Sequence, residues 1–217
     1  MIFNHGSSRE YDEHVDLAPL FTSRGYAFFF PFRRGHGRSE GPYVGDILDR
    51  ARTRSDADWS RALVDQMGAQ VEDQLSAIAY LSSLALVDPQ RIVAIGSSFG
   101  GIQSTLIAES AAIRGSVSFA GAAMTWARSP DLRARLLQSV SNARVPLLFI
   151  QAENDFDLTP SAALAEALAR AGKAGRRIVY PAVGKTPMDG HRILYSSPEV
   201  WATDVFDFFD SVTGPRA

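Results

Sequence analysis

Residues 91–101, with the sequence RIVAIGSSFGG, decide how this chain folds. A short apolar run ends at a glycine here, and a second apolar run, residues 102–113, follows at once with helical character. Gly96, Ser98 and Gly100 make the pattern G-x-S-x-G, which occurs where a strand turns sharply into a helix. At such a turn we expect Ser98 to adopt a strained backbone conformation, and any Cβ at position 96 or 100 to collide with the neighbouring chain. The pattern therefore predicts a serine whose oxygen points out at the edge of a sheet, beside the positive end of a helix.

On both sides of this turn, short apolar runs alternate with longer runs of helical spacing. The short runs are continuously apolar, which is typical of strands that are covered on both faces. This alternation predicts an α/β fold, with a mostly parallel sheet and helices on both faces, in a single domain over residues 1–217. In such a sheet, ligands bind at the carboxyl ends of the strands. The expected strands are Met1–His5, Tyr26–Phe32, Arg91–Gly96, Ser116–Ala120, Pro146–Gln151 and Arg177–Ala182.

Hydroxyl residues and prolines mark where two of the later helices begin. Thr159-Pro160 and Ser197-Pro198 each place a hydroxyl before a proline, which suits a helix cap followed by the first helical residue. Gly172 and Gly214 lie where these two helices should end.

The composition excludes several classes of function. The 217 residues carry 22 basic and 24 acidic side chains, a net charge of −2, whereas a nucleic-acid-binding protein should carry a clear basic excess. Cysteine is absent, which excludes a thiol nucleophile, disulfide bonds and cysteine-ligated metal sites. Gly35-His36-Gly37 does not extend to a dinucleotide fingerprint and no metal-binding motif is found, so neither a cofactor nor a metal is expected. No stretch resembles a membrane span, and no leader peptide precedes the first apolar residues, which favours a cytoplasmic location.

A serine needs a base to become a nucleophile, and the chain contains only four histidines. His191 follows Asp189 and Gly190, in a loop expected between the last strand and the last helix. We therefore predict that His191 is the base. For His5, His14 and His36, loop packing or solvent exposure is a sufficient explanation.

An acidic residue must orient the imidazole and stabilise its cation. Glu153-Asn154-Asp155-Phe156-Asp157 follows the fifth expected strand. Asp155 lies at a suitable spacing past the end of that strand to reach across the top of the sheet, and we favour it as the acid. Asp157 is the alternative, although its position just before a helix also suits an interaction with the helix dipole.

With these motifs in this order, the chain resembles the α/β-hydrolase family, in the branch that contains the dienelactone hydrolases and small carboxylesterases without a cap domain. The resemblance extends over nearly the whole chain. Residues 34–39 are also similar to a loop of serine peptidases of the prolyl oligopeptidase type. The segments that carry the resemblance are residues 3–8 (FNHGSS), residues 33–39 (RRGHGRS), residues 96–101, Asp155 and Gly190-His191.

The resemblance implies a catalytic triad of Ser98, His191 and Asp155, and an oxyanion hole formed by the backbone N–H groups of Ser7 and Phe99. Dienelactone hydrolases themselves have a cysteine at the position of Ser98, which argues against lactone cleavage. The chain opens at what would be the family's third strand, so the first two edge strands are expected to be missing from the sheet. An exposed sheet edge of this kind suggests a homodimer.

The function implied is that of a serine hydrolase that cleaves small or short-acyl carboxylic esters through an acyl-enzyme intermediate. A thioesterase, or a peptidase of the prolyl oligopeptidase type, would use the same triad and is one alternative. A catalytically silent hydrolase fold that serves as a binding module is another.

The connections between strands indicate the kind of substrate. The segment of residues 121–145 is too short for a helical cap domain, so we expect an open cleft that binds a small-molecule ester. Extra residues lie instead at positions 41–70. The candidates for the pocket wall are Tyr43, Trp59, Met67 and Trp126.

Overall fold

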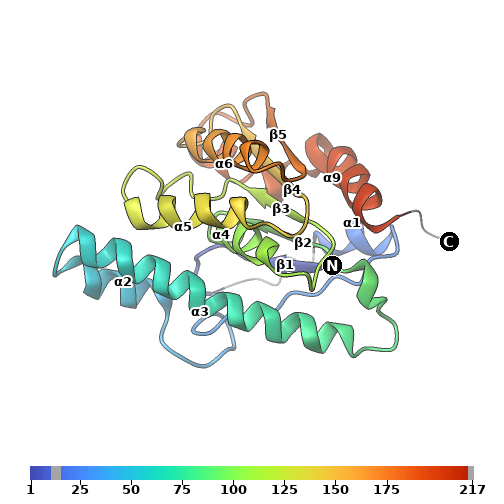
Figure 1. The fold of residues 1–217 in the computed structure, drawn as a ribbon, viewed down its shortest axis with the longest axis horizontal. Coiled ribbons are helices and arrows are strands. Elements are labelled where there is room, and N and C mark those ends of the chain that lie inside the picture. The colour runs from blue at the N-terminus through green and yellow to red at the C-terminus, as the bar shows by residue number, and fades with distance from the viewer. Residues whose placement is uncertain (11–15, 215–217) are drawn as a thin grey trace.

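The computed structural model describes residues 1–10 and 16–214, which form a parallel sheet with helices on both faces (Figure 1). Five strands pair in sequence order, each parallel to the next. All residues of the first four strands are buried, whereas the fifth strand lies at an edge and is partly exposed. The predicted α/β fold is confirmed. The strands are β1 (Ile2–Asn4), β2 (Ala94–Ser97), β3 (Ser116–Phe119), β4 (Leu147–Ala152) and β5 (Gly175–Tyr180).

Four helices cover one face of the sheet (Figure 1). Their apolar side chains enclose a core in which Leu136 and Leu164 pack with Leu147 and Phe149 of β4. A further helix, α2 (Val44–Arg52), packs against the first of the four. The four helices are α3 (Asp56–Ser82), α4 (Phe99–Leu106), α5 (Pro130–Ser141) and α6 (Thr159–Arg170).

The opposite face is covered by aromatic side chains from both ends of the chain. Phe21 belongs to α1 (Ala18–Thr22), and Trp201 and Phe206 belong to α9 (Pro198–Thr213). The Trp201 ring packs edge-on against Phe119 of β3, with 5.2 Å between the ring centroids. Shorter elements complete the fold: the 3₁₀ helices η1 (Pro89–Arg91) and η2 (Ile107–Glu109), and the short α-helices α7 (Pro187–His191) and α8 (Ile193–Ser196).

The strand predicted at Tyr26–Phe32 is wrong as a full strand. This segment lies beside β1 and forms a single parallel bridge, between Phe29 and Ile2. The Phe29 N–H donates to the Met1 carbonyl at 3.0 Å, and the Phe29 carbonyl accepts from the Phe3 N–H at 2.8 Å. The next donor in this register would belong to residue 31, which is a proline without an N–H, so the ladder stops.

The predicted helix starts are partly wrong, whereas the predicted ends are confirmed. Thr159 is the first residue of α6 rather than its cap, and its N–H donates to the Asp157 carboxylate at 2.8 Å. Ser197 occupies the cap position of α9, but its side chain makes no capping hydrogen bond. Gly172 and Gly214 follow the two helices with φ values of 66° and 76°, which glycine adopts without strain.

The connection between β3 and β4 contains α5 and no helical cap, as predicted. Residues of α2 and the first turns of α3 lie instead at the carboxyl edge of the sheet, where they help to form a pocket. Within residues 1–10 and 16–214, no helix combines the length and the hydropathy that crossing a bilayer would require.

Candidate active site

Ser98 joins β2 to α4 at the carboxyl edge of the sheet. Its φ of 57° and ψ of −116° lie outside the regions open to most residues other than glycine. A Cβ on Gly96 would lie 2.4 Å from the carbonyl oxygen of Gly100, and one on Gly100 would lie 1.8 Å from the carbonyl oxygen of Asn4. No side chain fits at such distances, so both positions require glycine. The prediction of a strained serine between two obligatory glycines is confirmed.

His191 lies within hydrogen-bond distance of this serine. Its Nε2 is 3.0 Å from the Ser98 Oγ. His191 is the last residue of the single-turn helix α7, rather than the loop residue that the sequence suggested. The turn begins with a capping box, in which the Thr186 hydroxyl accepts from the Asp189 N–H and the Asp189 carboxylate accepts from the Thr186 N–H. Hydrogen bonds from the backbone N–H groups of Lys185 and Thr186 hold the pKa of the Asp189 carboxyl below its usual range.

Asp155 completes a hydrogen-bonded chain that runs to Ser98. Its Oδ1 lies 2.7 Å from the His191 Nδ1 and also accepts from the Phe156 N–H at 2.7 Å. Its Oδ2 accepts from the Gln151 Nε2 at 2.7 Å. The side chains of Asp155 and His191 are 0% and 7% exposed, so this carboxylate has exchanged water for fixed N–H donors.

Asp157, the alternative acid, makes different contacts. Its Oδ1 accepts from the N–H of Thr159, the first residue of α6, and its backbone carbonyl accepts from Gln151 at 2.8 Å. These contacts are those of a residue that caps a helix start. The structure therefore brings Asp155, rather than Asp157, to the imidazole.

Gln151 and Asn154, which the sequence analysis did not single out, hold Asp155 and the segment before His191 in place. Asn154 donates to the carbonyls of Val183 and Thr186, both at 2.8 Å, and accepts from the Val183 N–H at 2.9 Å. These bonds tie the segment before α7 to the loop that carries Asp155. A Cβ on Gly190 would lie 2.5 Å from the Asn154 Oδ1, so this close approach also requires glycine. No sequence motif marks either residue: the partners of Asn154 are backbone groups about 30 residues away, and Gln151 contacts Asp155 and Asp157 without belonging to any recognisable pattern.

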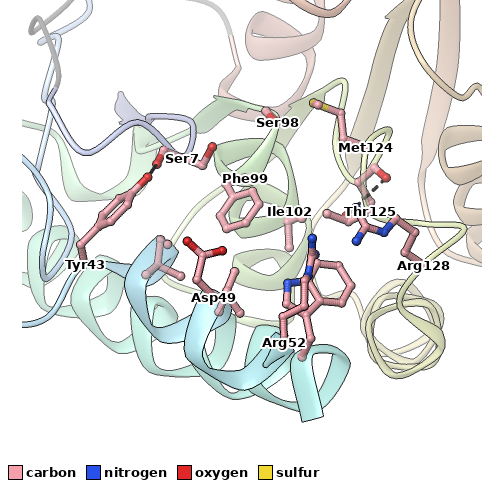
Figure 2. A pocket seen from close by; sticks show the side chains of 15 residues that line it. Ser7, Tyr43, Asp49, Arg52, Ser98, Phe99, Ile102, Met124, Thr125 and Arg128 are labelled. Carbon is pink, nitrogen blue, oxygen red and sulfur yellow. Dashed lines mark hydrogen bonds between the residues drawn. The ribbon is translucent and has the colours of Figure 1, made fainter. Parts of the chain in front are cut away.

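The residues of the two predicted oxyanion donors line the same pocket as Ser98. Phe99 is the first residue of α4, so its backbone N–H has no acceptor within the helix. Ser7 follows β1 and lines the same pocket as Ser98 and Phe99 (Figure 2). The Tyr43 hydroxyl donates to the Ser7 carbonyl at 2.5 Å, which fixes the loop after β1.

A pocket of about 260 Å³ begins at these residues. The inner walls are apolar, and the outer end carries Asp49, Arg52 and Arg128 (Figure 2). The guanidinium carbons of the two arginines lie 4.6 Å and 5.1 Å from the centre of the Trp59 ring. Of the four predicted wall residues, Tyr43 and Trp59 line the pocket, whereas Met67 and Trp126 belong to the buried core. The apolar wall also includes Val44, Leu48, Ile102 and Ala122.

The remaining histidines lie away from this hydrogen-bonded chain. His5 and His36 are fully buried, with 4.9 Å between their ring centroids, which agrees with a packing role. His14 lies outside the described residues. In the part of the chain that the structure describes, no three His, Asp or Glu side chains gather in a way that would hold a metal ion.

A serine at a strand-to-helix elbow, with an imidazole and a carboxylate in reach above a parallel sheet, defines an α/β-hydrolase. Within that class, residues 7–200 match the dienelactone hydrolase family, and the chain belongs to this family. It is therefore an α/β-type serine hydrolase, which confirms the resemblance drawn from the sequence.

Solved structures share this fold. The esterase Pf2001 of Pyrococcus furiosus has a TM-score of 0.70 at 19% identity, over 98% of this chain and 82% of that chain. Est1E of Butyrivibrio proteoclasticus, solved with ferulic acid bound, has a TM-score of 0.65 at 17% identity, over 95% of this chain and 88% of its own. The acylaminoacyl peptidase of Pyrococcus horikoshii has a TM-score of 0.69 at 18% identity, over 99% of this chain, which spans only 37% of the peptidase. Identities this low show a shared fold alone. A comparison with curated protein sequences gave no match.

Proposed function

We propose that this protein hydrolyses carboxylic esters with small or short acyl groups through an acyl-enzyme intermediate on Ser98. The observation that carries the proposal is the hydrogen-bonded chain itself: 3.0 Å between Ser98 and His191, and 2.7 Å between His191 and Asp155. Both distances are those at which a base takes a proton from a nucleophile and an acid orients that base.

The reaction follows from these positions. The Ser98 Oγ attacks the ester carbonyl while its proton passes to the His191 Nε2, and the negative oxygen that forms accepts hydrogen bonds from the backbone N–H groups of Ser7 and Phe99. The bond to the alcohol oxygen then breaks, and that oxygen takes the proton from His191. A water molecule next gives a proton to His191 and attacks the acyl-enzyme, which releases the carboxylic acid and restores Ser98. Asp155 stabilises the imidazolium in both steps.

The pocket supports a small acyl group. It opens at Ser98 and holds about 260 Å³ between apolar walls, which is small beside sites for drug-sized ligands. Its walls come from α2 and Trp59 and from residues 98–102 and 122–128, and the space between them suits a short acyl group better than a long one.

A fluorophosphonate probe with mass mapping of the adduct tests the nucleophile. Wild-type protein should be labelled at Ser98, and Ser98→Ala should remain unlabelled and lose about 10⁶-fold in ester kcat. Ser97→Ala, a buried neighbour on β2, is the matched control and should keep its activity. Ester turnover that survives in the Ser98 variant would refute the assignment, and an unlabelled wild type would favour a silent binding module.

A substrate panel tests the leaving group. p-Nitrophenyl esters, acyl thioesters and dipeptide amides all suit the same acyl mechanism, so kcat/KM must be compared across the three classes under one set of conditions. We expect the short-chain esters to react fastest. A higher kcat/KM for thioesters or amides would replace the esterase assignment with a thioesterase or a peptidase.

A further inference from the structure

Arg33 is a buried arginine that the proposed mechanism does not use. It opens the segment RRGHGRS and is 2% exposed, among the largest fully buried side chains of the described chain. Burying a guanidinium is costly unless its N–H groups have acceptors, so their partners show what the residue is for.

The guanidinium of Arg33 forms hydrogen bonds with the loop that follows β1. Its Nη1 donates to the His5 carbonyl at 2.8 Å, and its Nη2 donates to the Gly6 carbonyl at 2.7 Å. Two successive carbonyls therefore accept from the two ends of one planar fork, a geometry that fixes the orientation of both peptide groups.

The direction of these carbonyls determines where the neighbouring N–H groups point. The described chain contains no cis peptide bond, and in a trans peptide the C=O and the N–H of the same group point in opposite directions. The peptide that carries the Gly6 carbonyl also carries the Ser7 N–H. Because the carbonyl faces Arg33, the Ser7 N–H points away from Arg33, and Ser7 lines the pocket together with Ser98. Charge-assisted donation to the Gly6 carbonyl also polarises this peptide and strengthens its N–H as a donor.

A buried polar network connects the same guanidinium to the helix that carries the other donor. The Arg33 Nε donates to the Gln70 Oε1 at 3.0 Å, and that oxygen also accepts from the Gln103 Nε2 at 3.3 Å. Gln103 belongs to α4, which begins at Phe99. The two N–H groups assigned to the oxyanion hole are therefore supported by one chain of hydrogen bonds through Arg33 and Gln70.

We infer that Arg33 is a positioning residue for the oxyanion hole: its guanidinium fixes the His5 and Gly6 carbonyls so that the Ser7 N–H faces the reacting carbonyl. This inference rests on the proposed ester hydrolysis. The inference predicts that a change at Arg33 weakens stabilisation of the transition state but not binding of the substrate, because the oxyanion forms only in the transition state.

Arg33→Lys tests the inference, because lysine keeps the positive charge but cannot span both carbonyls. With a p-nitrophenyl ester, kcat should fall by about 10²-fold, the loss typical of an oxyanion donor, with KM within about threefold of wild type. The shape of the pH profile of kcat/KM should not change, because His191 is untouched. Arg34→Ala is the matched control: Arg34 is exposed, pairs with Asp73 at 2.6 Å, and should leave kcat unchanged.

Two further measurements separate positioning from a general loss of structure. Added guanidinium ion, at millimolar concentration, should partly restore kcat in Arg33→Ala, whereas sodium chloride at equal ionic strength should not. If the Arg33 variants do not fold, Gln70→Leu provides the test. This substitution removes the hydrogen-bond acceptor of the Arg33 Nε, so the guanidinium is held less firmly and kcat should fall at least about fivefold.

Several results would overturn the inference while the wild type remains an active esterase that is labelled at Ser98. For Arg33→Lys, these results are an unchanged kcat, or a lower kcat/KM that comes from a higher KM. The others are an equal fall of kcat in Arg34→Ala, no rescue of Arg33→Ala by guanidinium, and an unchanged kcat in Gln70→Leu. An inactive, unlabelled wild type would instead refute the proposed function.

Discussion

His36 should make this protein sensitive to mild acid. The ring is fully buried, its Nδ1 lies 3.0 Å from the Arg34 carbonyl, and its Nε2 has no hydrogen-bond partner within the described residues. A protonated ring would carry an N–H on both nitrogens, so one donor would be buried without an acceptor. Burial, and then the nearby charge of Arg33, lower the pKa of His36 from 6.5 to about 4.

The size of the effect follows from that shift. In the unfolded chain the imidazole takes up a proton as the pH falls below its ordinary pKa of 6.5, whereas in the folded chain it stays neutral until about pH 4. The unfolded state therefore binds more protons in this window, so stability is fully present above pH 6.5 and is lost as the pH falls toward 4. Integration over the window gives a loss of about 2 kcal/mol by pH 5 and about 3 kcal/mol by pH 4.

Urea unfolding of wild type and His36→Asn at pH 7.5 and pH 5.0 measures this contribution. The asparagine amide keeps a donor for the Arg34 carbonyl but does not titrate. The variant therefore shows how much stability the protein loses in acid through all groups other than His36. Between the two pH values, the free energy of unfolding should fall by about 2 kcal/mol more in wild type than in His36→Asn, and the m-values of the two proteins should be equal. Equal losses in the two proteins would refute the reasoning and would mean that the buried ring accepts its proton without cost.

The other predictions concern the acid and the pocket. Asp155→Asn should lower ester kcat by about 10⁴-fold, because the imidazole loses its orienting carboxylate. Asp157→Asn should keep kcat and should lower the free energy of unfolding in urea by less than about 1 kcal/mol, because the amide oxygen can still accept from the Thr159 N–H and only the negative charge beside the start of α6 is lost. The opposite ranking of the two variants would exchange their roles. Ile102→Ala should deepen the apolar pocket and raise the hexanoate-to-acetate ratio of kcat/KM at least about tenfold, and an unchanged ratio would place the acyl group elsewhere.

The strand-to-helix turn was predictable because its requirements are local. The backbone conformation of Ser98 and the contacts at Gly96 and Gly100 all depend on residues within one turn, or on a strand directly beside it. Local steric demands of this kind leave glycines at fixed spacing, which a sequence displays. Asp155 and His191 were predictable for a second reason, since few acidic residues and only one histidine follow the later strands.

The failure at residues 26–32 has a different cause. Hydrophobicity predicted a strand at these residues, and the segment does lie beside β1 and is partly buried, but pairing depends on which N–H faces which carbonyl. Pro31 falls where the ladder needs a donor, and that fact is visible only once the register with β1 is known. Arg33 and Asn154 escaped prediction for a related reason: both bond to backbone carbonyls of distant segments, which have no sequence signature. Gln151 bonds within its own stretch of chain, to the Asp155 carboxylate and the Asp157 carbonyl, and no motif marks these contacts.

In the proposed mechanism, selectivity and chemistry depend on separate parts of the chain. The outer pocket wall comes largely from residues 43–59, whereas the proposed nucleophile, acid and base come from the ends of β2 and β4 and from α7. Residues that share no partner usually act additively. Substitutions at Leu48 or Trp59 should therefore change the preferred acyl group without altering the rate of fluorophosphonate labelling at Ser98. Arg33 belongs to neither part, since its hydrogen bonds reach the loop before Ser7 and Gln70 of α3. A change there should affect the chemical step for every acyl chain length alike.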